Sequence, residues 1–437
     1  MVGCAYRAPH GKRPDGNTGY DKNGTNRGDT RDAFKPKREE HPEVSTRNRV
    51  AIIGTRGFPS YYGGFETLLR HLVPYLAEHG WDVDVYCRDG VERISPGDGG
   101  DINHGNIRQV FTRGLESKSA STLTFGLTSS IHAAVGEKPD AALIMNVANG
   151  FWLPLLRARG VPAAVNVDGI EWDRDKWGAT AKKVFRSGAR MTARWADELV
   201  FDALEIGRRW NVEFGRGGTF IPYGGTSVDE APPDPEFPRG TYVLYVARFV
   251  PENSITQFVE AAEQIATRSR VVIVGSSGYG GEIEDKVRAA AEKNTNISWV
   301  GHVNNDQRLH ALWANAGVYF HGHSVGGTNP ALVQAMACGA PIVARDTPYN
   351  REVLGDAAVF SDPEPKDIAA KVSRVLGDAS LRTRIAIAAS ERQAAHYTWD
   401  LVCAKYEAVL TDLVERRGDA HSGITSPRRD GFRPSVG

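Results

Sequence analysis

The stretch RVAIIGTRGFPSYYGGFETLLRHLVPYLAEHGWDVDVYCR, Arg49–Arg88, decides the fold. It begins with an apolar run that ends in glycine, passes through a glycine-rich loop into a helical pattern, and closes on an alternating run typical of a strand. A strand, a helix and a strand in this order predict the first unit of a parallel sheet. Asp82 and Asp84 resemble a metal-binding pair, but alternation places both on the solvent face of a strand, so we assign no metal there.

Alternation of apolar runs with helical patterns continues beyond this unit and then restarts. The restart falls at TYVLYVAR, Thr241–Arg248, after a segment rich in proline, glycine and acid that we interpret as a linker over residues 224–240. Such alternation predicts a parallel sheet covered on both faces. We therefore expect an α/β protein with two doubly wound, Rossmann-like halves that face a cleft, and ligands at the carboxyl ends of the strands.

Composition limits the class of protein. The chain has 437 residues, with 53 Lys and Arg against 53 Asp and Glu, and 41% of its residues are hydrophobic. Balanced charge gives no bias toward nucleic acid, and four scattered cysteines lack the spacing of a metal site. No run is apolar and long enough for a membrane span or a signal peptide, so we expect a cytoplasmic protein. Residues 1–48 and 417–437 are expected to be disordered tails.

Two glycine-bearing loops precede helices and favour anions at the helix starts. The first contains Gly63 and Gly64; its spacing is not GxGxxG, so it does not support a dinucleotide fingerprint, and a tight strand–helix connection is the alternative. The second is HSVGGTNPALVQAMACG, His323–Gly339, in which Asn329 is the expected N-cap and Pro330 the first helical residue. Backbone N–H groups at such a start converge on one point.

Three side chains add chemistry to these loops. Arg248 ends the strand that opens the second half, where a guanidinium can clamp phosphate; a surface salt bridge is the alternative. We expect His323, beside the second loop, to contact a donor substrate. Asp168 directly follows an apolar strand, so its carboxylate is expected to orient a hydroxyl or to stabilise positive charge on a sugar ring. The acidic residues of Glu171–Asp175 are interpreted as a charged helix start.

The segment AKKVFRSGARMTARWADEL, residues 181–199, has two stripes at helical spacing. The basic stripe consists of Lys183, Arg186, Arg190 and Arg194, and the adjacent one of Val184, Gly188, Met191 and Trp195. This pattern occurs in helices that lie on anionic membranes. A sheet-covering helix with a solvated basic face gives the same pattern. We favour the sheet-covering helix and keep a peripheral contact with the inner face of the membrane as the alternative.

Several long stretches, in order, resemble the glycosyl transferases group 1, which are GT-B-fold retaining glycosyltransferases of family 4, and within them a rhamnosyltransferase-like subgroup. These stretches are IIGTRGFPSYYGGFETLLRHLVPYLAEHGWDVDVYCR, VNVDGIEWDRDKW, YVARFVPEN, HGHSVGGTNPALVQAMACG and NREVLGDAAVF. The resemblance implies an acceptor-side domain over residues 49–223 and a nucleotide-sugar-binding domain over residues 241–395. It also implies a final helix over residues 396–416 that crosses back to the N-terminal domain.

The resemblance assigns roles to residues. The positions that match the family's diphosphate-binding features are Arg248, Gly63, Gly64, Gly326, Gly327, Thr328 and Asn329. In the family the arginine binds the diphosphate, the glycine pair lies beside it, and the backbone amides of the later loop hold it. The implied reaction requires no metal and no cofactor, and it moves a sugar from a nucleotide-sugar to a saccharide or a polyprenyl-linked acceptor.

The chain departs from the family pattern in the same loops. The family's two glutamates, seven residues apart, are replaced by Gly326, where the family contacts sugar hydroxyls, and Gln334, where it contacts the ribose. Gln334 is still expected to bond a ribose diol, whereas Gly326 favours a sugar with different or fewer hydroxyls, dTDP-rhamnose first. Asn253 or Ser254 replaces the phosphate-binding lysine, and Asp168 stands where many relatives have histidine.

The leading functional hypothesis is a retaining glycosyltransferase of the hexosyltransferase type, active in cell-surface polysaccharide or glycolipid biosynthesis. The alternative is a catalytically silent nucleotide-sugar-binding protein that has lost the glutamates and the lysine. Arg248 and the two intact glycine loops favour the enzyme. A third possibility, nucleotide-sugar epimerisation, requires acid and base groups for which the sequence offers no convincing set.

Overall fold

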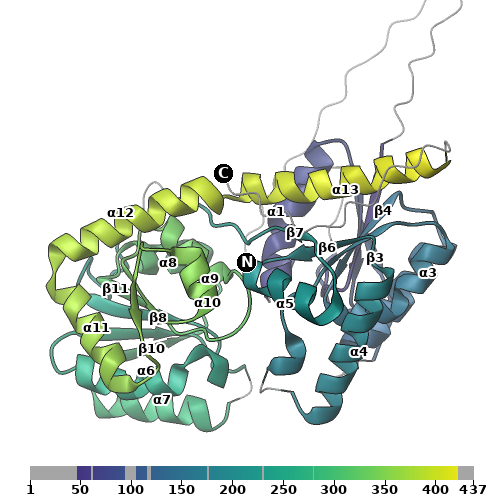
Figure 1. The fold of residues 1–437 in the computed structure, drawn as a ribbon. Helices are drawn as coiled ribbons and strands as arrows, with labels where there is room; N and C mark the ends of the chain where they lie inside the picture. The colour runs from purple at the N-terminus through teal and green to yellow at the C-terminus, as the bar shows by residue number, and fades with distance from the viewer. Residues whose placement is uncertain are drawn as a thin grey trace, which may run out of the picture. The chain divides into compact units, whose positions relative to one another are not determined.

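The computed structural model describes residues 47–60, 63–93, 105–115, 120–174, 177–228, 231–278 and 280–421. Two parallel sheets with helices packed on them make up this part of the chain (Figure 1). The predicted α/β class with two Rossmann-like halves is therefore confirmed. The predicted tail over residues 1–48 lies outside the described residues apart from its last two, and so does the predicted tail beyond residue 421.

The N-terminal half contains a seven-stranded sheet in the order β3-β2-β1-β4-β5-β6-β7. Its strands are β1 (Arg49–Ile53), β2 (Asp82–Cys87), β3 (Ile107–Phe111), β4 (Ala141–Met145), β5 (Ala163–Asn166), β6 (Glu198–Phe201) and β7 (Thr219–Phe220). The central strand β1 pairs Val50 with Val83 on one side and with Ala141 on the other. Covered on both faces, β1 and β4 read as nearly continuous apolar runs.

Helices cover both faces of this sheet. They are α1 (Gly64–Glu78), α2 (Ser121–Val135), α3 (Leu153–Ala158), α4 (Ala179–Trp195) and α5 (Leu204–Phe214), with short 3-10 turns η1 (Val147–Trp152) and η2 (Glu171–Asp173). Leu69 of α1 packs in the core that contains Val50 and Ile52, whereas Ala133 of α2 and Ala189 of α4 pack in the core on the opposite face. Side-chain alternation along β1 separates the two cores.

The paired aspartates of β2 differ from the sequence prediction. Asp84 is only 3% exposed rather than solvated. Its carboxylate accepts two hydrogen bonds from the guanidinium of Arg108, at 2.8 and 2.6 Å, and Arg49 lies 3.6 Å away. The neighbouring strand β3 ends the sheet with a polar side chain long enough to cover this carboxylate, which alternation within β2 alone could not reveal.

The C-terminal half contains a six-stranded parallel sheet in the order β10-β9-β8-β11-β12-β13. Its strands are β8 (Tyr242–Val246), β9 (Arg270–Val274), β10 (Ile297–Gly301), β11 (Val318–His321), β12 (Ile342–Arg345) and β13 (Val359–Ser361). Its helices are α6 (Ile255–Ile265), α7 (Glu282–Lys293), α8 (Asp306–Ala314), α9 (Pro330–Ala337), α10 (Pro348–Leu354), α11 (Pro365–Gly377) and α12 (Ala379–His396), with the turn η3 (Pro251–Asn253) before α6.

The last helix, α13 (Trp399–His421), packs against the N-terminal half. It follows α12 after two residues and lies along α1, β4 and β5 (Figure 1). Tyr406 is fully buried, and its hydroxyl accepts a hydrogen bond of 2.7 Å from Asn166 at the end of β5. The last helix thus packs on elements of the N-terminal half. It continues to His421, so the tail predicted from residue 417 begins too early.

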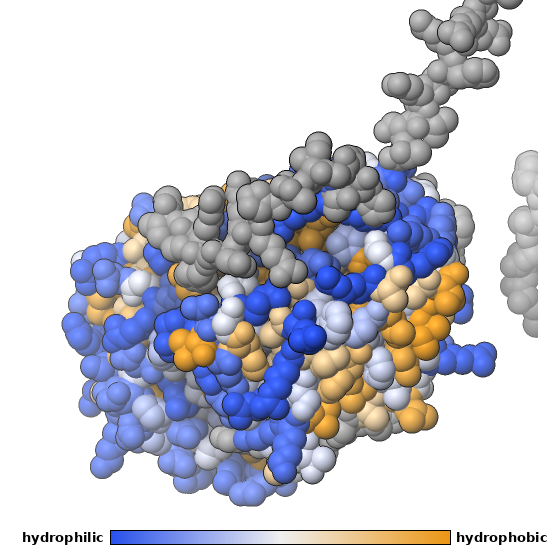
Figure 2. Space-filling view, turned by 45° about the vertical axis from the view of Figure 1, so that its right-hand side comes forward, coloured by the Kyte–Doolittle hydropathy of each residue, from blue (hydrophilic) through white to orange (hydrophobic). Residues whose placement is uncertain are grey.

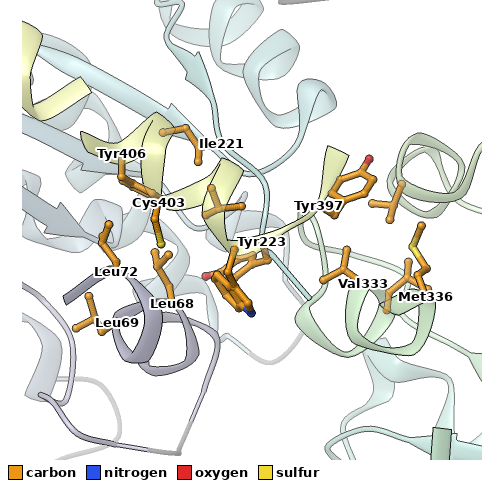
Figure 3. Close-up of a cluster of buried hydrophobic side chains, with 14 of the residues drawn as sticks. Leu68, Leu69, Leu72, Ile221, Tyr223, Val333, Met336, Tyr397, Cys403 and Tyr406 are labelled. Carbon is orange, nitrogen blue, oxygen red and sulfur yellow. The ribbon is translucent and has the colours of Figure 1, made fainter. Parts of the chain in front are cut away.

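A single apolar core joins α1, α9 and α13 with the segment that leaves β7 (Figure 3). Figure 3 shows side chains of α1 beside those of α13, with Tyr223 between them and α9: Leu68, Leu69, Leu72, Cys403, Tyr406, Tyr223, Val333 and Met336. The predicted linker, residues 224–240, is anchored rather than loose where it is described. Gly225 forms a bridge with Thr398, and Phe237 is 2% exposed.

Candidate donor site at the start of helix α9

The loop before α9 has the geometry that its sequence predicts. The Asn329 side chain accepts a hydrogen bond from the Ala331 N–H at 3.0 Å, and Pro330 is the first helical residue. Gly326 has a φ of +107°, which L side chains rarely adopt. Gly339 closes the helix with a φ of +68°. The loop therefore presents the N-terminus of an eight-residue helix with a capped and fixed backbone.

The same loop docks on Asp202, which follows β6 in the N-terminal half. The Thr328 N–H donates to the Asp202 backbone oxygen at 3.0 Å, and the Thr328 hydroxyl donates to the same oxygen. A Cβ on Gly327 would lie only 2.0 Å from the Asp202 carboxylate. The family resemblance gave the Thr328 amide to the donor diphosphate, but the structure uses it between the halves. Thr328 is therefore a structural contact rather than a free donor.

The start of α1 meets the start of α9. A Cβ on Gly64 would lie 3.1 Å from the Tyr223 hydroxyl and 3.7 Å from Pro330. Gly63 is the N-cap of α1 in an extended conformation, and no side chain caps the helix there. Glu66 in the first turn is buried and accepts the Arg56 N–H at 3.0 Å. The two helix N-termini thus lie close enough that a single methyl group on Gly64 would bring them into contact, and such a place favours an anion.

Arg248 and His323 lie on the C-terminal side of this junction. Arg248 follows β8, its side chain is exposed, and no carboxylate of the described residues lies within ion-pair distance. His323 stacks on His321 with ring centroids 4.4 Å apart. Burial, with the positive charges of Arg248 and Arg174, lowers the pKa of His323 to about 3. His323 therefore stays neutral at physiological pH and can only act through a hydrogen bond.

The side chains that replace the family's lysine are occupied. The Asn253 amide donates to the Arg248 backbone oxygen at 2.8 Å, and Asn253 is 5% exposed. The Ser254 hydroxyl donates to the Gly322 oxygen at 2.6 Å and accepts from Arg345 at 2.8 Å. These contacts fix the η3 turn against the loop after β11. Neither side chain provides a positive charge.

Asp168 lies on a strained turn after β5. Its φ is +65°, a left-handed conformation that aspartate tolerates better than most residues. Asn146 donates to its carboxylate at 3.2 Å, and its own N–H donates to Asn166 at 3.0 Å. Burial and the nearby charge of Asp168 raise the pKa of Asp202 well above its ordinary value, while Arg174 opposes this. Two carboxyl groups, those of Asp168 and Asp202, therefore interact at this edge of the sheet.

Gln334 is placed differently from its predicted role. Its amide nitrogen donates to the Thr226 oxygen at 2.8 Å, and its amide oxygen accepts the Thr226 N–H at 2.9 Å. Both polar groups of the side chain are therefore used on the linker. In this structure Gln334 holds residue 226 against α9, and a ribose diol would have to compete with two hydrogen bonds.

Two family models match the chain. Residues 63–209 match the glycosyl transferase 4-like domain, and residues 229–392 match the glycosyl transferases group 1. The first match covers most of the N-terminal sheet and the second the C-terminal sheet, in the order that the fold shows. The chain is similar to these glycosyl transferases over both of its sheets, and its architecture is that of the GT-B fold.

The curated relatives of this GT-B-fold chain are partial matches. The O-antigen chain mannosyltransferase B of Escherichia coli is 30% identical over 164 residues, which are 36% of this chain and 42% of the relative. The phosphatidyl-myo-inositol mannosyltransferase of Mycolicibacterium smegmatis is 31% identical over 219 residues, which are 47% of this chain and 56% of the relative. The chain thus spans about half the length of the curated relatives it matches.

Solved structures of the same fold cover more of the GT-B chain. The sucrose-phosphate synthase of Thermosynechococcus elongatus has a TM-score of 0.68 at 18% identity, over 84% of this chain and 100% of that one. HepE of Anabaena in complex with UDP-glucose has a TM-score of 0.63 at 14% identity, over 84% of this chain and 100% of that one. At these identities the likeness concerns the fold alone.

The basic helix of this GT-B-fold chain is α4. Its buried residues are Gly188, Ala189 and Thr192, and it packs on the η1 turn over the sheet, as a sheet-covering helix does. The four residues of the basic stripe, Lys183, Arg186, Arg190 and Arg194, are all exposed. Neither feature excludes the alternative of a membrane contact. No helix among the described residues has the length and hydrophobicity to cross a membrane.

Sequence reasoning missed three residues of the junction. Glu171, interpreted as part of a charged helix start, is 2% exposed within the turn η2 and forms an ion pair with Arg174. Asp175 lies outside the described residues. Asp202 and Arg174 were not singled out, because an aspartate after a strand and an arginine among acids are common on surfaces. Within the described residues, no group of three or more potential ligands could hold a metal ion.

Proposed function

We propose that this protein is a retaining glycosyltransferase. The observation that carries the proposal is the approach of the α1 and α9 N-termini at the carboxyl ends of strands from both sheets. Arg248, which follows β8 of the C-terminal sheet, is close enough to His323 for its charge to lower the pKa of that ring. The acceptor oxygen would form the new bond to the anomeric carbon of the nucleotide-sugar. The bond from that carbon to the diphosphate would break, and the acceptor proton would leave with the products, a glycoside and a nucleoside diphosphate.

The chain's own groups suit the charges that develop. Arg248 and the two helix starts would stabilise the departing diphosphate, which carries the largest developing charge. Asp168 would orient the acceptor hydroxyl or stabilise the oxocarbenium-like carbon. We predict about a hundredfold slower transfer for Asp168→Asn. Arg248→Ala should lower the affinity for nucleoside diphosphate. Unchanged diphosphate affinity in Arg248→Ala would refute the role of Arg248 in diphosphate binding. An unchanged transfer rate in Asp168→Asn would refute the role of Asp168 in the reaction.

For the donor, we propose a nucleotide-activated hexose or deoxyhexose. The resemblance to a rhamnosyltransferase-like subgroup and the missing carboxylate at Gly326 favour dTDP-rhamnose. The names of two relatives point instead to a mannosyl donor. We propose a saccharide or a polyprenyl-linked saccharide as the acceptor, in polysaccharide or glycolipid synthesis.

A donor panel tests the function. The protein would be incubated with dTDP-rhamnose, GDP-mannose and UDP-glucose, with and without a polyprenyl-linked saccharide, and release of nucleoside diphosphate would be measured. We expect acceptor-dependent release from one donor, and NMR of the product should show the donor's anomeric configuration. Binding without release across the panel would favour the silent nucleotide-sugar-binding alternative, and inversion would refute the retaining assignment.

We further propose that a polyprenyl-linked acceptor is met at the membrane surface through α4 and its neighbours. Helix α4 packs against α3, where the guanidinium carbon of Arg157 lies 5.7 Å from the centre of the Trp195 ring. α2, packed against α3, exposes Ile131 by 43% and Val135 by 76%. Figure 2 shows a continuous hydrophobic area beside hydrophilic ones on the face it presents. Apolar and basic side chains together suit an anionic lipid surface.

Vesicle binding tests the membrane proposal. We expect the protein to sediment with phosphatidylcholine vesicles that contain phosphatidylglycerol and much less with phosphatidylcholine alone. The double variant Ile131→Ser/Val135→Ser should lose this binding, while Ile387→Ser, which changes an apolar residue 53% exposed on α12, should keep it. Equal binding by all three proteins, or no binding to either vesicle, would argue against this surface.

A further inference from the structure

Arg174 of the N-terminal half reaches the α9 loop of the C-terminal half. Its Nε lies 2.7 Å from a Glu171 oxygen, and its side chain is only 17% exposed. Its Nη2 lies 3.0 Å from the position that a Cβ would take on Gly169 and 3.9 Å from that on Gly326. Both glycines have positive φ angles, +150° and +107°. The guanidinium is therefore held between one glycine of each half, in space that side chains would fill.

Arg174 and Arg248 act on the same ring. After burial, their positive charges are the two causes that lower the pKa of His323. Arg174 is also near Glu252, whose two carboxylate oxygens are buried without a hydrogen-bond partner among the described residues. The charges of the two arginines thus act on His323 from different halves of the chain, and Arg174 also approaches Gly326 in the loop before α9.

The η3 turn of the C-terminal half carries no cation of its own, and the nearby guanidinium of Arg345 is bonded to the Ser254 hydroxyl. The position of the family's lysine is filled by Asn253 or Ser254, and both side chains are bonded to backbone oxygens. A diphosphate carries more charge than Arg248 alone can balance. A guanidinium also offers paired N–H groups that match phosphate oxygens. Glu171 engages Nε, while Nη2 is the nitrogen that faces Gly326.

We propose that Arg174 is a second diphosphate-binding residue, supplied by the N-terminal half in place of the family's lysine. The inference rests on the proposed function, because it assumes a nucleotide-sugar donor between the two halves. The donor would then contact both halves of the chain. Its diphosphate would bind Arg248 and the α9 loop of the C-terminal half and Arg174 of the N-terminal half. The competing interpretation is that Arg174 only neutralises the carboxylates of Glu171, Asp168 and Asp202.

Calorimetric titration separates these interpretations. Wild-type protein would first be titrated with UDP, GDP and dTDP, and the tightest ligand would be compared with the nucleoside of the same base. The variants are Arg174→Gln, Arg174→Lys and the control Arg209→Gln, whose guanidinium lies on α5 in an ion pair of 2.5 Å with Asp173. Thermal unfolding without ligand would verify that each variant is folded.

We expect Arg174→Gln to raise the Kd for the diphosphate about thirtyfold or more while leaving the nucleoside Kd within about twofold. Arg174→Lys keeps the positive charge but loses the paired N–H groups of the guanidinium. Its Kd for the diphosphate should therefore lie between those of the wild type and Arg174→Gln. Arg209→Gln should bind as the wild type does. An unchanged diphosphate Kd, or equal losses for diphosphate and nucleoside, would overturn the inference. Absence of any nucleotide binding by the wild type would instead refute the proposed function.

Discussion

Gly327 shows how a missing side chain can position two halves of a protein. Its backbone passes directly over the Asp202 carboxylate, and this contact lies beside the hydrogen bonds from Thr328 to the same residue. A methyl group has no room there, because its nearest neighbour is buried and carries no flexible chain to move aside. Gly327 therefore contributes by letting the α9 loop approach Asp202, and not through a functional group of its own.

We predict that Gly327→Ala lowers the free energy of unfolding by about 1–3 kcal/mol, the usual cost of overpacking, and slows sugar transfer. The Cβ would push the α9 loop away from Asp202, with which it would otherwise overlap at 2.0 Å. The control is Gly377→Ala, where a Cβ has nothing within 4 Å. Chemical denaturation and diphosphate release measure the two effects; equal behaviour of both variants would contradict the role of this contact.

Asp202 gives a prediction about pH. Burial raises its pKa in the folded protein well above the ordinary value of 3.8, so the folded chain binds a proton that the unfolded chain has lost. The free energy of unfolding should therefore fall as the pH rises from 3.8 through the raised value. Asp202→Asn cannot titrate and should lack this fall. Denaturation at a series of pH values would show a variant increasingly more stable than the wild type.

Asp234 supplies a control of opposite sign. Although burial opposes it, the hydrogen bond from Arg308 lowers the pKa of Asp234 below 3.8. Its ion pair therefore contributes stability that is present above 3.8 and is lost as the pH falls through the lowered value. Asp234→Asn should be less stable than the wild type at neutral pH. If Asp202→Asn lost stability in the same manner, its carboxyl would be ionised in the folded protein.

At the scale of the element, α9 combines a local signal with a distant contact. Its sequence predicts both ends, because Asn329 caps the start, Pro330 occupies the first turn and Gly339 takes the positive φ at the close. Nothing in that stretch predicts that Thr328 bonds Asp202 or that Gln334 bonds Thr226, since both partners come from segments more than 100 residues earlier. The local sequence determines where α9 begins and ends, whereas tertiary contacts determine which partners its side chains and the preceding loop bind.

Capping separates stability from binding. We predict that Asn329→Ala costs about 1 kcal/mol of unfolding free energy and also weakens nucleoside diphosphate binding, because it frees the backbone at the donor end of α9. Asp378→Ala removes the N-cap of α12, whose carboxylate accepts the Leu381 N–H at 2.9 Å. This control should cost similar stability without changing the diphosphate Kd. A similar loss of affinity in both variants would mean that lowered stability alone weakens binding.

At the scale of the whole molecule, the sequence predicts the two sheets well because buried parallel strands such as RVAII and AALIM are apolar throughout. The junction between the sheets is harder to predict. Asp168 and Arg248 can be singled out in the sequence because they follow strands. The proposed role of Arg174 depends on its position between Gly169 and Gly326, which only the structure shows. Periodicity predicts which residues are buried, but it does not predict which loops meet.

The transfer reaction is predicted to need no metal. In the proposed reaction, arginines and helix N-termini would carry the diphosphate charge. Diphosphate release from the preferred donor should therefore continue at an unchanged rate after dialysis against EDTA. A loss that magnesium or manganese restores would show that a divalent ion shares this task.

Helix α13 has a consequence for how the protein is made. It covers the N-terminal sheet but is the last described segment to be synthesised, after the whole C-terminal half. Until it emerges, Asn166 lacks the Tyr406 hydroxyl, and the part of α1 that packs on α13 is uncovered. Domains usually fold in the order of synthesis. The N-terminal half is therefore synthesised with part of its apolar surface uncovered. We expect this half to aggregate when it is expressed alone, unless residues 399–421 are supplied as a separate peptide.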